Sequence, residues 1–228
     1  WTRDWPAARR EYDQAVALAP ADATIRQWHA MYFETLGNFE ASLQEIERAR
    51  KLDPLSVTIL ANVARRYAMA RRYTQAQEAL DATFKLNPRF PLGRVIELEI
   101  VLMQGRIEQA IALMRASDLS ESGSEREGTR ALRRGFQVGG RRGFYQAMVR
   151  LNTSVAATDV GHAYRLATAY AGLGDTDHAI EWLRRAKDEQ EPQLAWLAVH
   201  PTWDKIREDP RFNTLVREVG IPTAAGAQ

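Results

Sequence analysis

The stretch Gly37-Asn38-Phe39-Glu40-Ala41-Ser42 has the pattern of a tight turn that opens a helix, and equivalents of it recur at a fixed interval. Three turn positions spaced 34 residues apart are Gly37, Arg71 and Gly105. Prolines with the same spacing, each after a run of apolar residues at helical intervals, are Pro20, Pro54 and Pro88. A fixed period of this length indicates an architecture built from helical repeats.

Composition excludes several classes of protein. The chain has 228 residues, of which 45% are hydrophobic and 26% charged, and no apolar run approaches the roughly 20 residues of a membrane span. It contains no cysteine, which excludes disulfides, thiol nucleophiles and cysteine-ligated zinc. A formal net charge of +2 is too small to argue for nucleic-acid binding. We therefore expect a water-exposed helical array without membrane insertion, and no nucleic-acid partner.

The repeat period divides the chain into expected units. They are residues 1–22 as the second helix of a truncated repeat, complete repeats at 23–56 and 57–90, a repeat with a degenerate end at 91–124, a diverged helical pair at 125–159, a repeat at 160–191, and a capping segment with a tail at 192–228. Because residue 1 is Trp, we expect the sequence to be a piece of a longer protein.

Two places break the regular pattern. Arg71 stands where the other turns have glycine, and this should cost some stability if the backbone is left-handed there. The polar stretch 118–128 is either a loop or a late-starting helix, and 125–152 is either a diverged repeat or a helical insertion whose length matches the period.

Residue sizes at equivalent positions resemble the tetratricopeptide repeat. Small residues recur at Ala30, Ala64 and Ala167 and again at Ser42, Ala76, Ala110 and Ala179, and larger partners recur at Phe33, Tyr67, Val101 and Tyr170. The departures are Ser42, Arg71, and the absence of Trp at the first signature position, occupied by Arg26, Leu60 and Arg94. The resemblance implies an all-α, right-handed superhelix, a solenoid of antiparallel helix pairs, here with a C-terminal capping helical tail.

The C-terminal part narrows this resemblance. The stretch Gly174-Asp-Thr-Asp-His-Ala-Ile-Glu-Trp-Leu183, followed by His200-Pro201 and Asp209-Pro210-Arg211-Phe212, is similar to the end of a bacterial group. In that group the repeats follow a winged-helix DNA-binding, nucleotide cyclase or protein kinase domain. The resemblance implies a regulatory or protein-interaction module of a signalling or transcription protein. The compartment stays open, with the bacterial cytoplasm favoured over the periplasm.

No pattern typical of catalysis or metal binding is present in the sequence. The four histidines, His29, His162, His178 and His200, lie in separate segments without metal-ligand spacing. The sequence has no phosphate-binding loop, nucleophile elbow or dinucleotide fingerprint. We predict a protein that is not an enzyme and has no catalytic residue, metal or cofactor.

The resemblance implies instead that the first helix of each repeat lines a groove for a protein or peptide partner. Carried over by position, the candidate groove residues are Gln27, Met31, Glu34, Asn62, Arg65, Met69, Glu99 and Tyr164. The alternative for some of them, including Met69, is helix packing. Rival functions are the sensing of a small molecule near Leu92, Val95 and Tyr164, and self-association through Trp1, Trp5 and Tyr12.

A second candidate surface is basic. It comprises Arg130, Arg133, Arg134, Arg141 and Arg142, with Arg126 and Arg150 on either side and Phe136, Phe144 and Tyr145 interleaved. These arginines could dock an acidic protein or a nucleic-acid backbone. Alternatively, they keep the outer face of a helix pair soluble while the aromatic residues form its core.

Overall fold

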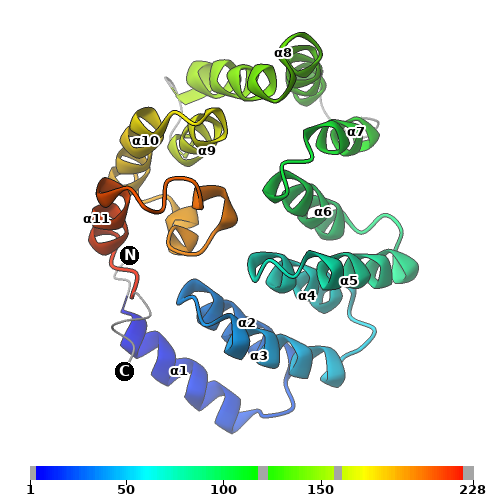
Figure 1. Ribbon diagram of the computed structural model, residues 1–228. Helices are drawn as coiled ribbons and strands as arrows, with labels where there is room; N and C mark the ends of the chain where they lie inside the picture. Colours follow the sequence, from blue (N-terminus) through cyan, green and yellow to red (C-terminus); the bar gives the residue numbers. More distant parts are fainter. Residues whose placement is uncertain (1–3, 118–122, 157–160, 223–228) are drawn as a thin grey trace. The chain divides into compact units, whose positions relative to one another are not determined.

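The computed structural model describes residues 4–117, 123–156 and 161–222, which form helices joined by short turns (Figure 1). The α-helices are α1 (Trp5–Leu18), α2 (Ala23–Thr35), α3 (Phe39–Leu52), α4 (Val57–Met69), α5 (Tyr73–Leu86), α6 (Pro91–Met103), α7 (Ile107–Ser117), α8 (Gly123–Ala156), α9 (Ala163–Leu173), α10 (Thr176–Asp188) and α11 (Pro210–Glu218). Two 3-10 helices, Pro192–Trp196 and Pro201–Trp203, precede α11. The described residues contain no strand, and the all-helical prediction is confirmed.

Polar caps fix where the helices begin. The Asp22 side chain accepts hydrogen bonds from the backbone N–H groups of Thr24 and Ile25 at 2.7 and 3.0 Å, which satisfies two donors of the first turn of α2. Asn38 caps α3 in the same way through the N–H of Ala41, at 3.1 Å. Each of these caps directly precedes the first residue of its helix.

The repeated turns share one backbone conformation. Gly37, Gly105 and Gly174 have φ values of 75°, 70° and 78°, in the left-handed region that ends a helix. Arg71 takes the same conformation with φ 62°, although its Cβ makes that region unfavourable. The turns between paired helices therefore repeat the same left-handed backbone conformation along this chain. At Arg71 this conformation is strained, because the residue has a side chain.

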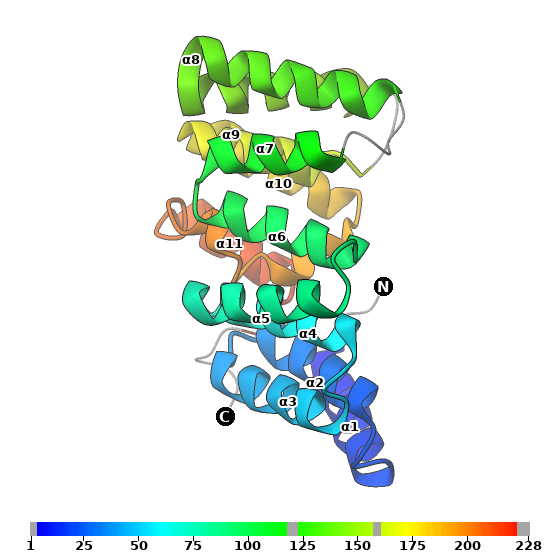
Figure 2. The same ribbon diagram turned by 90° about the vertical axis from the view of Figure 1, so that its right-hand side faces the viewer.

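The chain divides into two compact units, and the boundary falls inside α6. The first unit holds residues 1–100, 198–201 and 220–228, and the second holds 101–197 and 202–219. This division cuts across the sequence-based repeat boundaries, which stay predictions. In the first unit, α2 packs against α3 and α4 against α5, and the two pairs lie side by side (Figure 2). Their contacts centre on small residues such as Ala30 and Ala64, which are fully buried.

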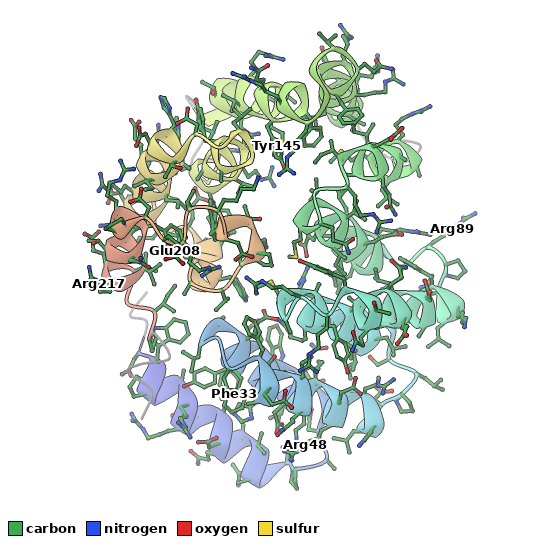
Figure 3. The ribbon with its side chains drawn as sticks, in the orientation of Figure 1. Phe33, Arg48, Arg89, Tyr145, Glu208 and Arg217 are labelled. Carbon is green, nitrogen blue, oxygen red and sulfur yellow. The ribbon has the colours of Figure 1, made fainter. Side chains whose placement is uncertain are left out.

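Aromatic residues join α1 to α2 in the first unit. Tyr12 stacks on His29 with ring centroids 5.7 Å apart, and His29 lies 4.3 Å from Phe33, which is labelled in Figure 3. Trp5 is held from the other end of the chain, because its Nε1–H donates a hydrogen bond to the Gly220 carbonyl oxygen at 2.6 Å. Trp5 and Tyr12 therefore have packing partners within the unit, while Trp1 lies outside the described residues.

In the second unit, α8 consists of two arms separated by a break at Gly139 and Gly140, where the backbone is not helical. A Cβ atom added at Gly143 would lie well under 3.0 Å from the Gly135 carbonyl oxygen, and the converse also holds. The two arms thus meet backbone to backbone at this glycine pair. Residues 123–128 are helical, which favours the late-starting helix over the loop, and residues 118–122 lie outside the described residues.

The C-terminal segment of the second unit packs its apolar side against α10. Phe212, Leu215 and Val216 on α11 are buried. Asp209 caps α11 by accepting from the N–H of Arg211 at 2.8 Å, and the Arg211 guanidinium reaches Asp177 on α10 at 2.7 Å. The capping tail expected from the sequence is therefore present, with its polar face held by an ion pair.

Candidate functional site

Equivalent positions of successive repeats meet on the first helix of each pair in the first unit. Met31 on α2, Arg65 on α4 and Glu99 on α6 are each 34 residues apart. The Arg65 guanidinium donates two hydrogen bonds to the Glu99 carboxylate, at 3.1 and 3.2 Å. The Arg65 side chain is 28% exposed and that of Glu99 is 40% exposed, so solvent reaches this ion pair. We call the face made by α2, α4 and α6 the inter-repeat face.

A second inter-repeat contact lies beside this ion pair. The Asn62 side-chain amide donates to the Gln27 side-chain oxygen at 3.2 Å and to the Thr58 carbonyl at 3.0 Å. Both Asn62 and Gln27 are largely buried. Their polar groups mainly fix the register between α2 and α4, and they offer a partner little accessible surface.

Two expected groove residues are not accessible. Glu34 is buried and forms an ion pair with Arg66 of the next repeat, which is itself buried. Met69 is also buried, with 2% of its surface exposed. In this conformation neither side chain can contact a partner. Glu34 and Met69 are therefore packing residues rather than groove residues. The reason is tertiary: a charged residue at a groove position is neutralised by an arginine 32 residues further along.

Exposed apolar side chains accompany the accessible ion pair. Val95 on α6 is 51% exposed, and Trp28 on α2 is 47% exposed. Met31 is partly buried. Val95 was expected near a small-molecule site, and the exposure of Trp28 was not predicted. The inter-repeat face thus has exposed apolar side chains as well as a solvent-accessible ion pair.

Tyr164 belongs to the second unit, whereas the other candidates belong to the first, and it contacts the C-terminal segment. Its hydroxyl accepts a hydrogen bond from Trp203 Nε1 at 3.2 Å, and its backbone N–H donates to Glu191 at 3.1 Å. Burial raises the pKa of the Tyr164 hydroxyl, which therefore stays protonated at neutral pH. Its contacts are those of a packing residue.

The buried histidine of the first unit is set among charges. Burial lowers the pKa of His29, while Glu45 and Asp13 oppose that effect from 3.8 and 3.7 Å. Arg26 forms an ion pair with Glu45, with a nitrogen–oxygen distance of 2.9 Å. Within the described parts of the chain, no group of three or more His, Asp or Glu side chains could hold a metal ion.

The basic residues lie around the break in α8. Arg130, Arg134, Arg141 and Arg142 are exposed and Arg133 is partly buried, whereas the Arg126 side chain lies outside the described ones. Of the interleaved aromatics, Phe144 and Tyr145 are buried in a core with Ile107 and Ile111. Tyr145 packs on Gly172 of α9, where no side chain would fit (Figure 3 labels Tyr145). These aromatics therefore serve the core.

Two features near the break were not predicted. Val138 is 88% exposed at the end of the first arm of α8. A cavity of about 550 Å³ lies between α7 and the break, with Ile107, Phe136 and Arg141 among its lining residues. Nothing in the local sequence could have revealed this cavity, because it depends on how the arms pack against α7. Across the described helices, none has both the length and the apolar character of a membrane span.

The fold and the inter-repeat contacts define a helical-repeat protein. Sequence profiles described as tetratricopeptide repeat match residues 2–57 and 63–124, and another profile of that description matches 163–191. The chain belongs to the tetratricopeptide repeat family. Such repeats are in general protein–protein interaction modules. No curated protein matches the chain.

A solved tetratricopeptide repeat structure has a similar fold, and two others match less well. A tetratricopeptide repeat protein from Parabacteroides merdae matches with a TM-score of 0.61 and 14% identity, over 95% of this chain and 78% of that one. YrrB, described as a tetratricopeptide repeat protein with an unusual peptide-binding site, gives 0.43 and 18%, over 82% and 95%. The P58(IPK) tetratricopeptide domain gives 0.39 and 15%, over 95% and 60%. At these identities the likeness concerns the fold alone.

Proposed function

We propose that the first unit binds a peptide segment of a partner protein on the inter-repeat face, and that the chain is the regulatory part of a bacterial signalling or transcription protein. The observation that carries the binding proposal is the solvent-accessible pair of Arg65 and Glu99 beside the half-exposed Val95. Met31 and Trp28 extend the apolar part of the same face.

This arrangement suits a segment with a carboxylate near an aliphatic side chain. A solvent-accessible ion pair contributes only about 0–1 kcal/mol, so a partner carboxylate can replace Glu99 on Arg65 at small cost. Arg65 can then bind the incoming carboxylate with two hydrogen bonds. Burial of Val95 and the partner's aliphatic side chain adds about 25 cal/mol per Å² of apolar surface removed from water.

The binding proposal is tested with peptides selected from a random displayed library against the intact chain. For a selected peptide, we expect Val95→Glu and Arg65→Glu to weaken binding at least tenfold in fluorescence polarisation. Arg48→Glu is the matched control, because Arg48 is an exposed arginine on α3 of the same unit (Figure 3). Equal affinity of all four proteins would contradict the proposal.

The regulatory proposal rests on the similarity of residues 174–212 to the bacterial group named above. It is tested by the sequence that precedes Trp1 in the parent gene. A DNA-binding, cyclase or kinase domain there would support it, and another kind of domain or a start codon would contradict it.

A further inference from the structure

The break in α8 presents a small surface that the inter-repeat face does not involve. We define the α8 tip as Arg133, Arg134, Val138, Arg141 and Arg142. All residues from 137 to 142 are exposed. The tip thus combines four arginines with one aliphatic side chain that is 88% exposed, within ten residues of sequence. It lies wholly within the second unit.

The arginines of the tip lie close together in sequence, and none of them has an acidic partner among the described residues. Among the described residues, Arg133, Arg134 and Arg142 form no ion pair. The Arg141 guanidinium lies 5.5 Å from the Tyr145 ring centroid and beside Gly105, a position that leaves it without a carboxylate. A group of like charges without counter-charges is self-repelling, and this repulsion opposes folding.

Helix electrostatics also give no structural reason for two of these residues. Arg141 and Arg142 open the second arm of α8, directly after the break at Gly139 and Gly140. The N-terminus of a helix carries partial positive charge, so a cation there is unfavourable. Arginines at other surface positions would keep the protein soluble equally well. Such positions would also avoid the unfavourable interaction with the helix N-terminus.

A cavity adjoins the charges. It has a volume of about 550 Å³, and its lining combines apolar Ile107, Ala112 and Phe136 with the charged residues Arg106, Glu108 and Arg141. Its size is within the range of ligand-binding clefts. A segment held by the arginines could place one apolar side chain in this cavity and cover Val138, whose exposure is otherwise unfavourable.

We propose that the α8 tip docks an acidic segment of a partner protein, whose carboxylates bind the arginines and whose single apolar side chain enters the cavity. Planar guanidinium groups bind carboxylates through two parallel hydrogen bonds. A nucleic acid fits less well. The aromatics that could stack on bases, Phe144 and Tyr145, are buried. This surface is separate from the inter-repeat face and does not depend on the function proposed for it.

The test uses the intact chain and a fluorescent ten-residue peptide with glutamates around one central leucine. We expect saturable binding that weakens at least tenfold when the salt concentration rises from 50 to about 300 mM, since charge pairing is screened. The paired substitution Arg134→Glu with Arg142→Glu should weaken binding at least tenfold. Arg72→Glu, an exposed arginine in the first unit, is the control and should leave binding unchanged.

Two further probes separate the cavity from simple charge attraction. Ala112→Trp fills the cavity from an exposed position, and a peptide with serine in place of leucine leaves the cavity empty. Each should weaken binding at least fivefold. Equal binding by the wild type and the double arginine variant, no effect of either cavity probe, or tighter binding of a ten-nucleotide single strand would each overturn the proposal. Thermal unfolding verifies that the variants, all at surface positions, remain folded.

Discussion

Arginines on the inter-repeat face and at the α8 tip have opposite surroundings. On the first, Arg65 and Arg66 each hold a carboxylate that lies about one repeat away in sequence, Glu99 and Glu34. At the tip, no described arginine holds one. The difference distinguishes two roles of arginine in this protein. Paired arginines fix the register between repeats, and unpaired ones remain available to a partner, which a count of charges along the sequence does not distinguish.

The largest effect is expected from breaking the buried pair of the first region. Glu34→Ala leaves the buried Arg66 without its counter-charge and should lower the free energy of unfolding by about 3–5 kcal/mol. The control is Glu40→Ala, which removes the exposed pair between Glu40 and Arg72 and should cost less than about 1 kcal/mol. Urea unfolding followed by circular dichroism measures both. Similar losses for the two variants would mean that burial does not distinguish the pairs.

The next effect concerns the support of the tip. Gly143→Ala places a methyl group against the Gly135 carbonyl and should force the arms of α8 apart, at a cost of about 1–3 kcal/mol. Gly128→Ala in the same helix meets nothing within 4 Å and should instead stabilise the protein by about 0.5–1 kcal/mol. Urea unfolding of both variants tests whether the two arms of α8 meet at Gly135 and Gly143. Stabilisation by Gly143→Ala would show that the arms do not meet at this residue.

A smaller effect on the free energy of unfolding is expected from substitutions at the left-handed turn positions of the two units. Arg71→Gly removes a side chain from a left-handed backbone position and should raise the free energy of unfolding by about 1 kcal/mol. Gly174→Ala makes the reverse change in the second unit. Because nothing lies within 4 Å of the added Cβ, its cost of about 1 kcal/mol comes from backbone strain alone. Thermal and urea unfolding should give opposite signs, and matching signs would contradict the strain at Arg71.

The smallest effect tests the charges of the tip itself. Arg142→Ala removes a cation from the start of the second arm and should stabilise the fold by about 0.3–1 kcal/mol. Arg134→Ala removes one near the end of the first arm, where a cation is favourable, and should destabilise it by a similar amount. Low-salt urea unfolding resolves the two signs. A loss from Arg142→Ala would reveal a structural role and weaken the case for a docking surface.

The sequence predicted the features that local signals control. The turn at Gly37, the 34-residue period and the residue sizes at equivalent positions predicted a solenoid of antiparallel helix pairs, which the structure has. It could not predict the burial of Glu34, because the groove position and the pairing arginine lie on different helices. Nor could it predict the meeting of Gly135 with Gly143, since two glycines four residues from a break are equally typical of a flexible loop. Such contacts depend on how helices cross.

The hydrogen bond between Trp5 and the Gly220 carbonyl has a consequence for the order of folding. It joins residues 215 positions apart within one unit, which also contains residues 198–201. At about 5–20 residues per second, synthesis reaches Gly220 roughly 10–40 seconds after Trp5. The contact between α1 and Gly220 therefore forms only after the intervening residues have been synthesised, so the first unit is completed after the residues of the second unit have been made.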